Sequence, residues 1–475
     1  MDAADVRRLK PMLTQYLKRF DDCFDRSDTR AHLSVYVEGQ LSDLSAKSVE
    51  PMAVHAGVAP RTLQEFLAQH RWQEDRLRDR LQQLVVAEHA GPHGIGVIDE
   101  TSDVKKGDKT PGVQRQWCGK VGKQENCLVT VHLGFARDDF HCLVDGELYL
   151  PLSWSEDRQR CREAGIPDEM VYRPKWQIAL ELYDRARANG VQLEYVVADE
   201  GYGGKPDFLR ELHARGQCFV VEVPRTVVGW LTEPQVTQRP FRKGRGPGRK
   251  TPRLTRRSRP AISVERMLKH SPELRDQPWV RYRVKDGEKG PMVWEVKHVL
   301  ITMKDPQGLP GLRLHLVVAR NALDPNEVKF FLSNAPPETS VQTLLLVGFS
   351  RWHIERCFED QKGEVGLDQF EGRKYLGLKR HLLLTCVSYL FLARVCQQLR
   401  EKKTSSDGLP SPRCPRRARP CLVVARARLA GAHRTRRGGE PADTTTQRPG
   451  AQVPHQGNPP KTTTFRHQAI QSHSL

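Results

Sequence analysis

The stretch that decides the fold is residues 349–374, which read FSRWHIERCFEDQKGEVGLDQFEGRK. On an α-helix, residues four, seven and eleven positions apart return to nearly the same angle, and one stripe then holds Arg351, Glu355, Phe358 and Lys362. The stripe places one acidic group between two basic groups. Alone, it is typical of a solvated helix face with ion pairs worth about 0.3–0.5 kcal/mol each. Its further meaning depends on two aspartates upstream.

Those two aspartates each follow a short apolar run. Asp99 lies near the end of a predicted strand at residues 94–101, and Asp199 near the end of another at residues 194–200. In a mixed sheet these strands can lie side by side, which would bring the two carboxylates close together. Close carboxylates repel each other, and a divalent cation resolves the repulsion. With Glu355 as third ligand, such a site could hold two Mg²⁺ ions about 3.5–4 Å apart, as in-line displacement at a phosphodiester requires.

Each of the three acids also has a purely structural interpretation. Asp99 or Asp199 could end its strand or cap the next helix, and Glu355 could pair with Arg351. The metal-site interpretation is favoured by the presence of all three acids in this order of elements, together with the positive charge of the chain. Nearby substitutes, if a predicted element is shifted, are Glu100, Glu200, Glu359 and Asp360.

The composition points to a polyanionic partner. The 475 residues carry 76 Lys and Arg against 57 Asp and Glu, a formal net charge of +19. A soluble protein this basic usually meets nucleic acid. We expect no signal peptide, and the longest apolar run, residues 382–395, is too short for a bilayer and predicts a buried core helix. The eleven cysteines lack zinc-ligand spacing and fit a reducing cytoplasm.

The order of patterns predicts an α/β protein in five parts. An all-α region spans residues 1–90 and is followed by β-β-β-α-β-α-β, a core with a mixed five-stranded sheet and flanking helices, at 91–224. A β-rich insertion at 225–343 precedes the second part of the core, with the Glu355 helix, at 344–400. The basic tail at 401–475 is expected to be disordered.

Two segments are candidates for contact with DNA. Residues 48–72 have the outline of a helix-turn-helix, which is a weak signal because any two short packed helices produce it. Residues 239–259 contain ten Lys or Arg and no acid, among them Arg242, Lys243 and Arg245. This basic loop is either a solvated linker or a contact with DNA phosphates, and its charge favours phosphates.

The order of elements resembles the RNase H-like fold, and the motifs resemble those of DDE-type transposases of bacterial insertion sequences. The resemblance is to the superfamily named after insertion sequence four, in the branch described as DDE superfamily endonuclease, and it covers about residues 30–395. Its motifs are DETSDVKKG at 99–107, GVQRQWCGKVGKQENC at 112–127, VADEGYG at 197–203, and the R-x3-E-x6-K spacing of Arg351, Glu355 and Lys362. The tyrosine of that last signature is replaced by Gly348.

The resemblance implies a transposase that binds the terminal inverted repeats of an insertion sequence through its helical N-terminal region. It would cleave there with two Mg²⁺ ions, for which Mn²⁺ can substitute, and join the 3′-OH ends to target DNA. Asp99, Asp199 and Glu355 would be the catalytic metal ligands, and Arg351 and Lys362 would contact phosphates. The active form would be a homodimer in the bacterial cytoplasm, associated with the nucleoid and not with a membrane.

The segment after the first predicted strand is either a flexible surface loop or, by the same resemblance, a DNA-contacting segment beside the catalytic pocket. Tyr202 could stack on a flipped base or serve in ordinary packing. Two other functions remain open: a metal-dependent endonuclease that never joins strands, and a catalytically inactive DNA-binding relic. Candidate contacts in the segment are Lys105, Lys106, Arg115, Gln116, Lys120 and Lys123.

Overall fold

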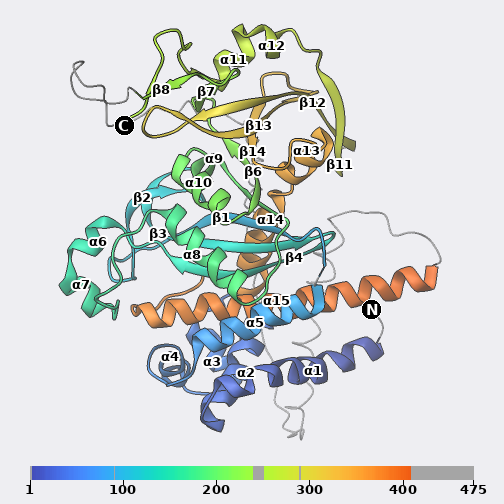
Figure 1. The fold of residues 1–475 in the computed structure, drawn as a ribbon. Coiled ribbons are helices and arrows are strands. Elements are labelled where there is room, and N and C mark those ends of the chain that lie inside the picture. The colour runs from blue at the N-terminus through green and yellow to red at the C-terminus, as the bar shows by residue number, and fades with distance from the viewer. Residues whose placement is uncertain (1–2, 90, 239–250, 288–289, 408–475) are drawn as a thin grey trace, which may run out of the picture. The chain divides into compact units, whose positions relative to one another are not determined.

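The computed structural model describes residues 3–89, 91–238, 251–287 and 290–407, which all belong to one compact unit, Met1–His433. The basic tail predicted to be disordered lies outside the described residues, apart from the end of the last helix. Figure 1 shows helices below and above a long sheet. The protein is a mixed α/β structure, as the sequence predicts.

Five α-helices form the N-terminal region, and a Gly57 turn joins the third to the fourth. Gly57 has φ 73° and ends its helix in the left-handed conformation, which glycine adopts without strain, while Pro60 stands in the first turn of the next helix. The predicted helix-turn-helix outline is therefore present. The helices are α1 (Ala3–Leu17), α2 (Ser27–Leu41), α3 (Val49–Ala56), α4 (Pro60–Ala68) and α5 (Glu74–His89), with a 3₁₀ turn at Lys18–Cys23.

The strands within residues 91–224 follow the predicted order, with one additional strand that the sequence did not reveal. β1 (Ile95–Val104) pairs antiparallel with β3 (Lys123–Arg137), and β3 with β4 (Phe140–Leu148). β5 (Tyr195–Ala198) lies parallel to β1, and β6 (Cys218–Val223) parallel to β5. The additional strand is β2 (Gln114–Cys118), an edge strand paired with β3.

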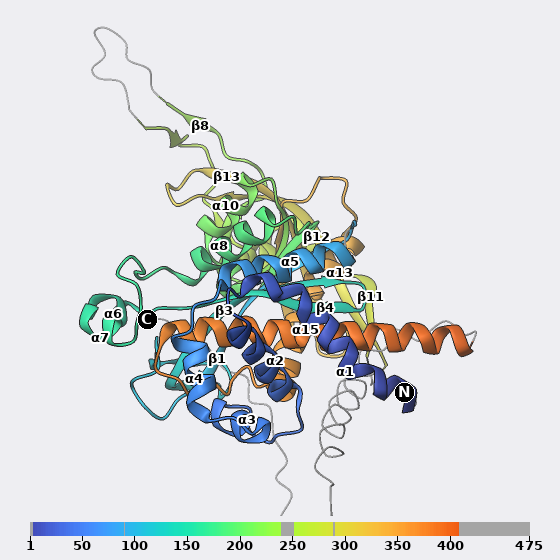
Figure 2. The same cartoon turned by 90° about the horizontal axis from the view of Figure 1, so that it is seen from below.

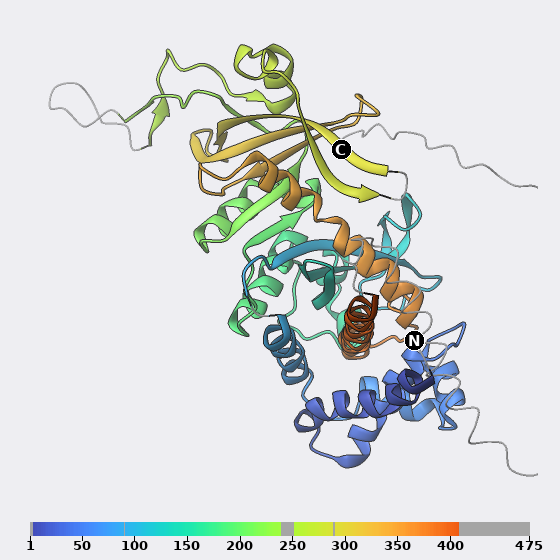
Figure 3. The ribbon, with the colours of Figure 1, turned by 90° about the vertical axis from the view of Figure 1, so that its right-hand side faces the viewer.

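Helices cover both faces of this part of the sheet. Adjacent residues of a strand point to opposite faces. On β1, Asp99 pairs with Arg351, next to α14 (Trp352–Asp360), and Glu100 pairs with Lys175 of α8 (Lys175–Ala188). Figure 3 shows the orange helix α14 beside the blue strand β1. The shorter helices of the core are α6 (Leu152–Glu156), α7 (Arg158–Glu163), α9 (Glu200–Gly203) and α10 (Pro206–Ala214).

The insertion continues the same sheet. β14 (Val328–Ser333) pairs antiparallel with the free edge of β6, so its hydrogen-bonding groups are satisfied by strands from the insertion. The sheet therefore has twelve strands rather than the predicted five. The other elements of the insertion are β7 (Val228–Trp230), β10 (Ile262–Ser263), α11 (Val264–His270), α12 (Pro272–Arg275), β11 (Val280–Gly287), β12 (Gly290–Lys304) and β13 (Pro310–Asn321), with a separate pair β8 (Val236–Thr237) and β9 (Arg253–Leu254).

The stretch that carries Glu355 is less regular than the single helix that the sequence predicts. α13 (Val341–Phe349) is followed by α14 and then by a π-helical turn, Gln361–Val365, which ends at Gly366 with φ 76°. Lys362 lies on this wider turn, so the predicted straight stripe is interrupted. Phe358 is buried and does not belong to a solvated face.

Gly348, on α13, is closely approached by the sheet, so the tyrosine that the family signature would place there would require its neighbours to shift. A Cβ at this position would lie 3.1 Å from two ring atoms of Phe331 and 3.3 Å from Val220. The close approach of α13 to the sheet therefore explains the glycine.

The last helix, α15 (Tyr375–Asp407), joins the sheet to the N-terminal helices (Figures 1 and 2). Residues Tyr375–Leu399 are long and apolar enough to cross a membrane, but most of this segment is buried inside the protein, as predicted for a core helix. Buried polar contacts fix the junction. Tyr16 donates a hydrogen bond to the Val387 carbonyl (2.9 Å), and Ser388 donates one to Gln40 (2.7 Å).

Arg380 of α15 closes the carboxyl end of α4. Its guanidinium is almost fully buried over Trp72 and donates hydrogen bonds to the carbonyls of Leu67 (3.1 Å) and His70 (2.8 Å) and to the Glu74 carboxylate (3.1 Å). This one side chain satisfies carbonyl groups that a helix end leaves without partners.

We expect Arg380→Met to lower the free energy of unfolding by about 2–4 kcal/mol, because it leaves several carbonyls at a buried site without their donor and removes the closer cation partner of the half-buried Glu74. Urea unfolding followed by circular dichroism measures this. The neighbouring Lys379→Met is the control, since Lys379 makes partly exposed ion pairs and should cost less than about 1 kcal/mol. Equal losses for the two variants would contradict the role given to Arg380.

Candidate active site

Asp99 and Asp199 stand at the same level of neighbouring strands. β1 and β5 are parallel, and their last aligned pair is Ile98 with Ala198, directly before the two aspartates. Adjacent strands lie about 4.8 Å apart. The predicted adjacency of these two strands is thus confirmed, and it brings the two carboxyl groups together.

Asp199 also has the structural role that the sequence left open. It is the N-cap of α9, and its Oδ1 accepts hydrogen bonds from the backbone N–H groups of Gly201 (2.9 Å) and Tyr202 (3.3 Å). Asp99 Oδ1 accepts one from the N–H of Glu100 (2.8 Å). Capping holds the Asp199 carboxylate at the end of β5, so the structural and chemical interpretations are compatible.

The electrostatics of the pair show excess negative charge. Burial, and then the charge of Asp199, raise the pKa of Asp99 to about 7, although Arg351 acts in the opposite direction. Burial and the charge of Glu100 likewise raise the pKa of Asp199. Carboxyl groups that resist ionisation because they are buried beside other acids are suited to bind a cation.

Glu355 is connected to the pair through Arg351. The guanidinium Nη1 lies 3.1 Å from Asp99 Oδ2, and Nη2 lies 2.5 Å from Glu355 Oε1. The predicted ion pair on the helix is therefore formed, and Arg351 stands between two of the three acids. Although burial opposes it, the carboxylates of Glu355 and Asp99 raise the pKa of Arg351.

Asp99 and Asp199 fit a divalent cation by position and by charge, whereas Glu355 does not yet face them. Its side chain is 55% exposed and is engaged by Arg351. Within the described part of the chain, no group of three His, Cys, Asp or Glu side chains is arranged to hold a metal ion. A three-carboxylate site would therefore require Arg351 to release Glu355.

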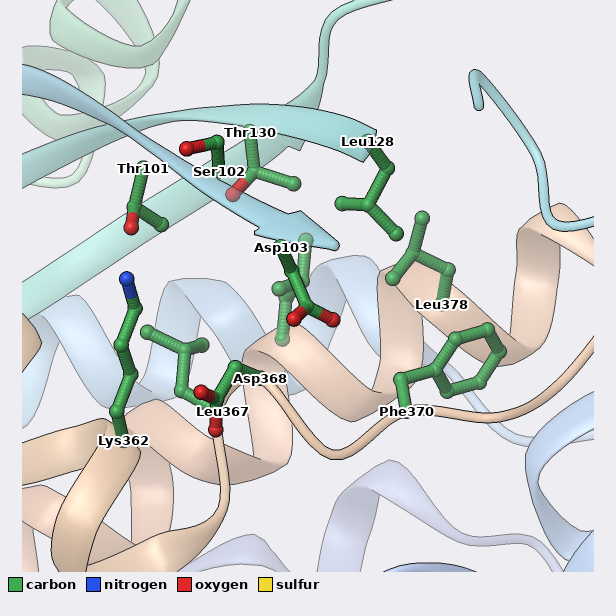
Figure 4. A pocket seen from close by; sticks show the side chains of 11 residues that line it. Thr101, Ser102, Asp103, Leu128, Thr130, Lys362, Leu367, Asp368, Phe370 and Leu378 are labelled. Carbon is green, nitrogen blue, oxygen red and sulfur yellow. The ribbon is translucent and has the colours of Figure 1, made fainter. Parts of the chain in front are cut away.

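Lys362 faces the same side of β1 as Asp99. It lines a pocket with Thr101, Asp103 and Asp368, and Figure 4 shows its ammonium group pointing toward Thr101, two residues beyond Asp99. Burial lowers the pKa of Lys362. The π-helical turn thus directs a desolvated amine at the strand that carries Asp99.

Two of the lysines predicted to contact DNA already have protein partners. Lys105 forms an ion pair with Asp103 and donates a hydrogen bond to the Phe370 carbonyl (2.6 Å). Lys120 lies 2.8 Å from Asp368. Both lysines thereby connect residues 368–370, which follow the π-helical turn, to the strands of the sheet.

The other cations predicted to contact DNA, in the β1–β2 connection and the hairpin of β2 and β3, are exposed. They are Lys106, Arg115 and Lys123, and Lys123 lies 3.4 Å from Glu125. The half-buried Gln116 side chain donates to the Cys127 carbonyl (2.8 Å) within the hairpin. Arg242, Lys243 and Arg245 lie outside the described residues.

Tyr202 does not fit the base-stacking role considered for it. The side chain is 2% exposed and packs against Phe208, with ring centroids 5.8 Å apart. Tyr202 lies on α9, the helix that Asp199 caps, and its side chain is buried in the protein interior. Stacking on a DNA base is therefore incompatible with its position.

One acid of the site was missed from the sequence. Glu222 aligns with Asp199, because Ala198 is paired with Val221 on the parallel strands β5 and β6. The signal is an acid after an apolar run, the same pattern that identified Asp99 and Asp199. The pattern was overlooked because Glu222 is followed by another apolar residue and looks like the middle of a strand.

We expect Asp99→Asn to stabilise the metal-free protein at pH 8 by about 1–3 kcal/mol and to have little stabilising effect at pH 4. The folded pKa of Asp99 is about 7, above the usual value, so the folded protein holds this proton more tightly and loses stability as the pH rises from about 4 through 7. Urea unfolding in EDTA across this range is the measurement. A constant effect at every pH would contradict the assigned environment.

Comparison with known proteins places part of the chain in a family. A model of the DDE superfamily endonuclease family matches residues 19–291. A probable transposase for insertion sequence element IS701 from Microchaete diplosiphon is 35% identical over 190 residues, which are 39% of this chain and 46% of that protein. The chain thus matches less than half the length of that relative.

Among solved structures, the NurA nuclease from Sulfolobus solfataricus aligns with 71% of this chain and 94% of its own, at 10% identity and a TM-score of 0.24, too low to support an argument. The family match spans more than half of the sequence, includes Asp99 and Asp199, and agrees with the resemblance to insertion-sequence transposases seen in the motifs. The chain belongs to the DDE superfamily endonucleases.

Proposed function

We propose that the protein is a transposase that cleaves DNA at the terminal inverted repeats of an insertion sequence and joins the 3′-OH ends to target DNA. The observation that carries the proposal is the alignment of Asp99 and Asp199 on parallel strands, next to a helix that presents Arg351 and Glu355. The strand row β4-β3-β1-β5-β6, with its first three strands antiparallel and β5 and β6 parallel to β1, supports an RNase H-like core within the larger sheet.

The three carboxylates would hold two Mg²⁺ ions, or Mn²⁺ in their place, with Asp99 and Asp199 as the preformed part of the site. When bound, the ions would activate the attacking water or 3′-hydroxyl and stabilise the leaving oxygen. Arg351 would turn from Glu355 toward a DNA phosphate, which accepts two hydrogen bonds from a guanidinium as a carboxylate does. Glu355 would then be free to complete the ligand set.

The remaining cations would place the DNA along this face. Lys362 points from the π-helical turn toward Thr101, two residues beyond Asp99, and the exposed Lys106, Arg115 and Lys123 extend the positive charge along the β1–β2 connection and the β2–β3 hairpin. The α3–α4 pair would bind the inverted repeats, and the basic loop 239–259 would add phosphate contacts. Because joining requires two DNA ends held together, the active form would be a homodimer on DNA in the bacterial cytoplasm and nucleoid.

Cleavage and joining of a labelled duplex that carries the element's own end test the proposal. In Mg²⁺ or Mn²⁺, we expect Asp99→Asn, Asp199→Asn and Glu355→Gln to lose activity by about 10²–10³-fold or more while still binding DNA. Glu359→Gln is the matched control, since it lies one turn further along α14 and pairs with Arg356. Full activity in any one of the first three variants would refute the assigned triad.

The same assay separates the alternatives. Cleavage without joined product would identify an endonuclease, and binding without cleavage by the wild-type protein would identify an inactive relic.

The position of Arg351 gives a second expectation. Arg351→Gln should tighten Mn²⁺ binding to the DNA-free protein by about tenfold, equivalent to 1.4 kcal/mol, because it removes a positive charge that competes for Asp99 and Glu355. The same variant should lose DNA cleavage. Isothermal titration calorimetry with Mn²⁺ measures the binding, and weaker binding in the variant would contradict the competition.

A further inference from the structure

Three neighbouring parallel strands present acids at one level of the sheet. Asp99, Asp199 and Glu222 follow Ile98, Ala198 and Val221, which are aligned across β1, β5 and β6. At about 4.8 Å per strand, Glu222 lies roughly 10 Å from Asp99. The row of acids therefore extends beyond the proposed metal ligands toward the insertion.

Glu222 faces the same side of the sheet as Arg351. Val220, two residues earlier on β6, lies against Gly348 of α13, so this face of β6 is turned toward α13. The charge of Glu222 also contributes to raising the pKa of Arg351. Glu222 is thus part of the electrostatic surroundings of the site.

Lys329 of β14 neutralises Glu222. Its Nζ lies 2.8 Å from Oε1 and 3.0 Å from Oε2 of Glu222, and the lysine side chain is 27% exposed. On the paired strands, Glu222 stands opposite Phe331, which places Lys329 diagonally across on the same face. The insertion thereby contributes a cation to the edge of the catalytic face.

We propose that Lys329 contacts a DNA phosphate near the scissile bond, and that Glu222 holds its side chain in place in the DNA-free protein. The short span of roughly 10 Å between the levels of Asp99 and Glu222 keeps Lys329 within reach of a phosphate close to the one that is cleaved. A DNA phosphate would take the ammonium from Glu222, as another takes the guanidinium of Arg351 from Glu355. This inference rests on the proposed function, because it requires DNA on this face.

A purely structural ion pair between β6 and β14 is the competing explanation, and the contrast between variants of Lys329 and Glu222 separates the two explanations. Lys329→Gln should bind an element-end duplex about 3–10-fold more weakly and lower the steepness of the salt dependence by about one. Glu222→Gln should bind as tightly as wild type or more tightly, because it releases the lysine. If the pair is only structural, both variants will bind DNA as wild type does or will weaken together.

Fluorescence anisotropy in EDTA over a series of salt concentrations measures binding without cleavage. Lys304→Gln is the control for charge, since Lys304 is exposed on β12 and is separated from β6 by β13 and β14. Thermal melting confirms that each variant is folded. An unchanged salt dependence in folded Lys329→Gln would overturn the inference.

The two proposals can fail separately. If Lys329→Gln binds normally while wild type cleaves and Asp99→Asn does not, the Lys329 contact is wrong and the transposase site stands. If wild type fails to bind the element-end duplex, the proposed function is wrong and the Lys329 contact is excluded with it.

Discussion

The organisation of the site depends on the repulsion between two carboxyl groups that the sheet forces together. β1 and β5 are parallel and aligned up to the residues before Asp99 and Asp199, so neither strand can separate them without a shift of register. Burial makes their ionisation costly, as do the charge of Asp199 at Asp99 and the charge of Glu100 at Asp199, and Arg351 relieves only part of that cost. A protein that keeps such a pair gives up stability, and the proposed binding of a divalent cation would offset that loss.

Arg351 links this pair to the helix that carries Glu355. Its guanidinium bridges Asp99 and Glu355, and it therefore occupies the place between the acids in the DNA-free protein. Under the proposed function, this arrangement would connect metal binding to DNA binding, because a phosphate that attracts Arg351 would also free Glu355. Two parts of the surrounding fold hold the strands and helix of the site in place. The insertion extends the sheet through β14, and α15 fixes the helices 3–89 beneath it.

The sequence predicts the two aspartates at the strand ends because that signal is local. An apolar run followed by an acid identifies the strands ending near Asp99 and Asp199, whereas their pairing could only be expected as one possibility in a mixed sheet, and the structure shows it. The edge strand β2 was missed because Gln114, Arg115 and Gln116 provide no apolar alternation. The width of the sheet was also missed, since nothing in the sequence of β6 shows that β14, more than a hundred residues later, will pair with it.

The remaining errors concern the direction of side chains. Tyr202 is adjacent to the site in sequence, but the Asp199 cap turns it into the core. Lys105 and Lys120 are basic residues in a glycine-rich segment, yet Asp103 and Asp368, the latter far away in the sequence, bind them. From charge alone, each of these lysines is predicted to contact DNA. Only the tertiary structure shows which of them already form ion pairs within the protein.

The most direct test of the account is the anomalous scattering of Mn²⁺ in crystals of the protein bound to an element-end duplex. The account predicts Mn²⁺ within coordination distance of both Asp99 and Asp199, with Arg351 moved from Glu355 to a DNA phosphate. A duplex bound at this face with Arg351 still bridging Asp99 and Glu355, and with no Mn²⁺ at the two aspartates, would contradict it.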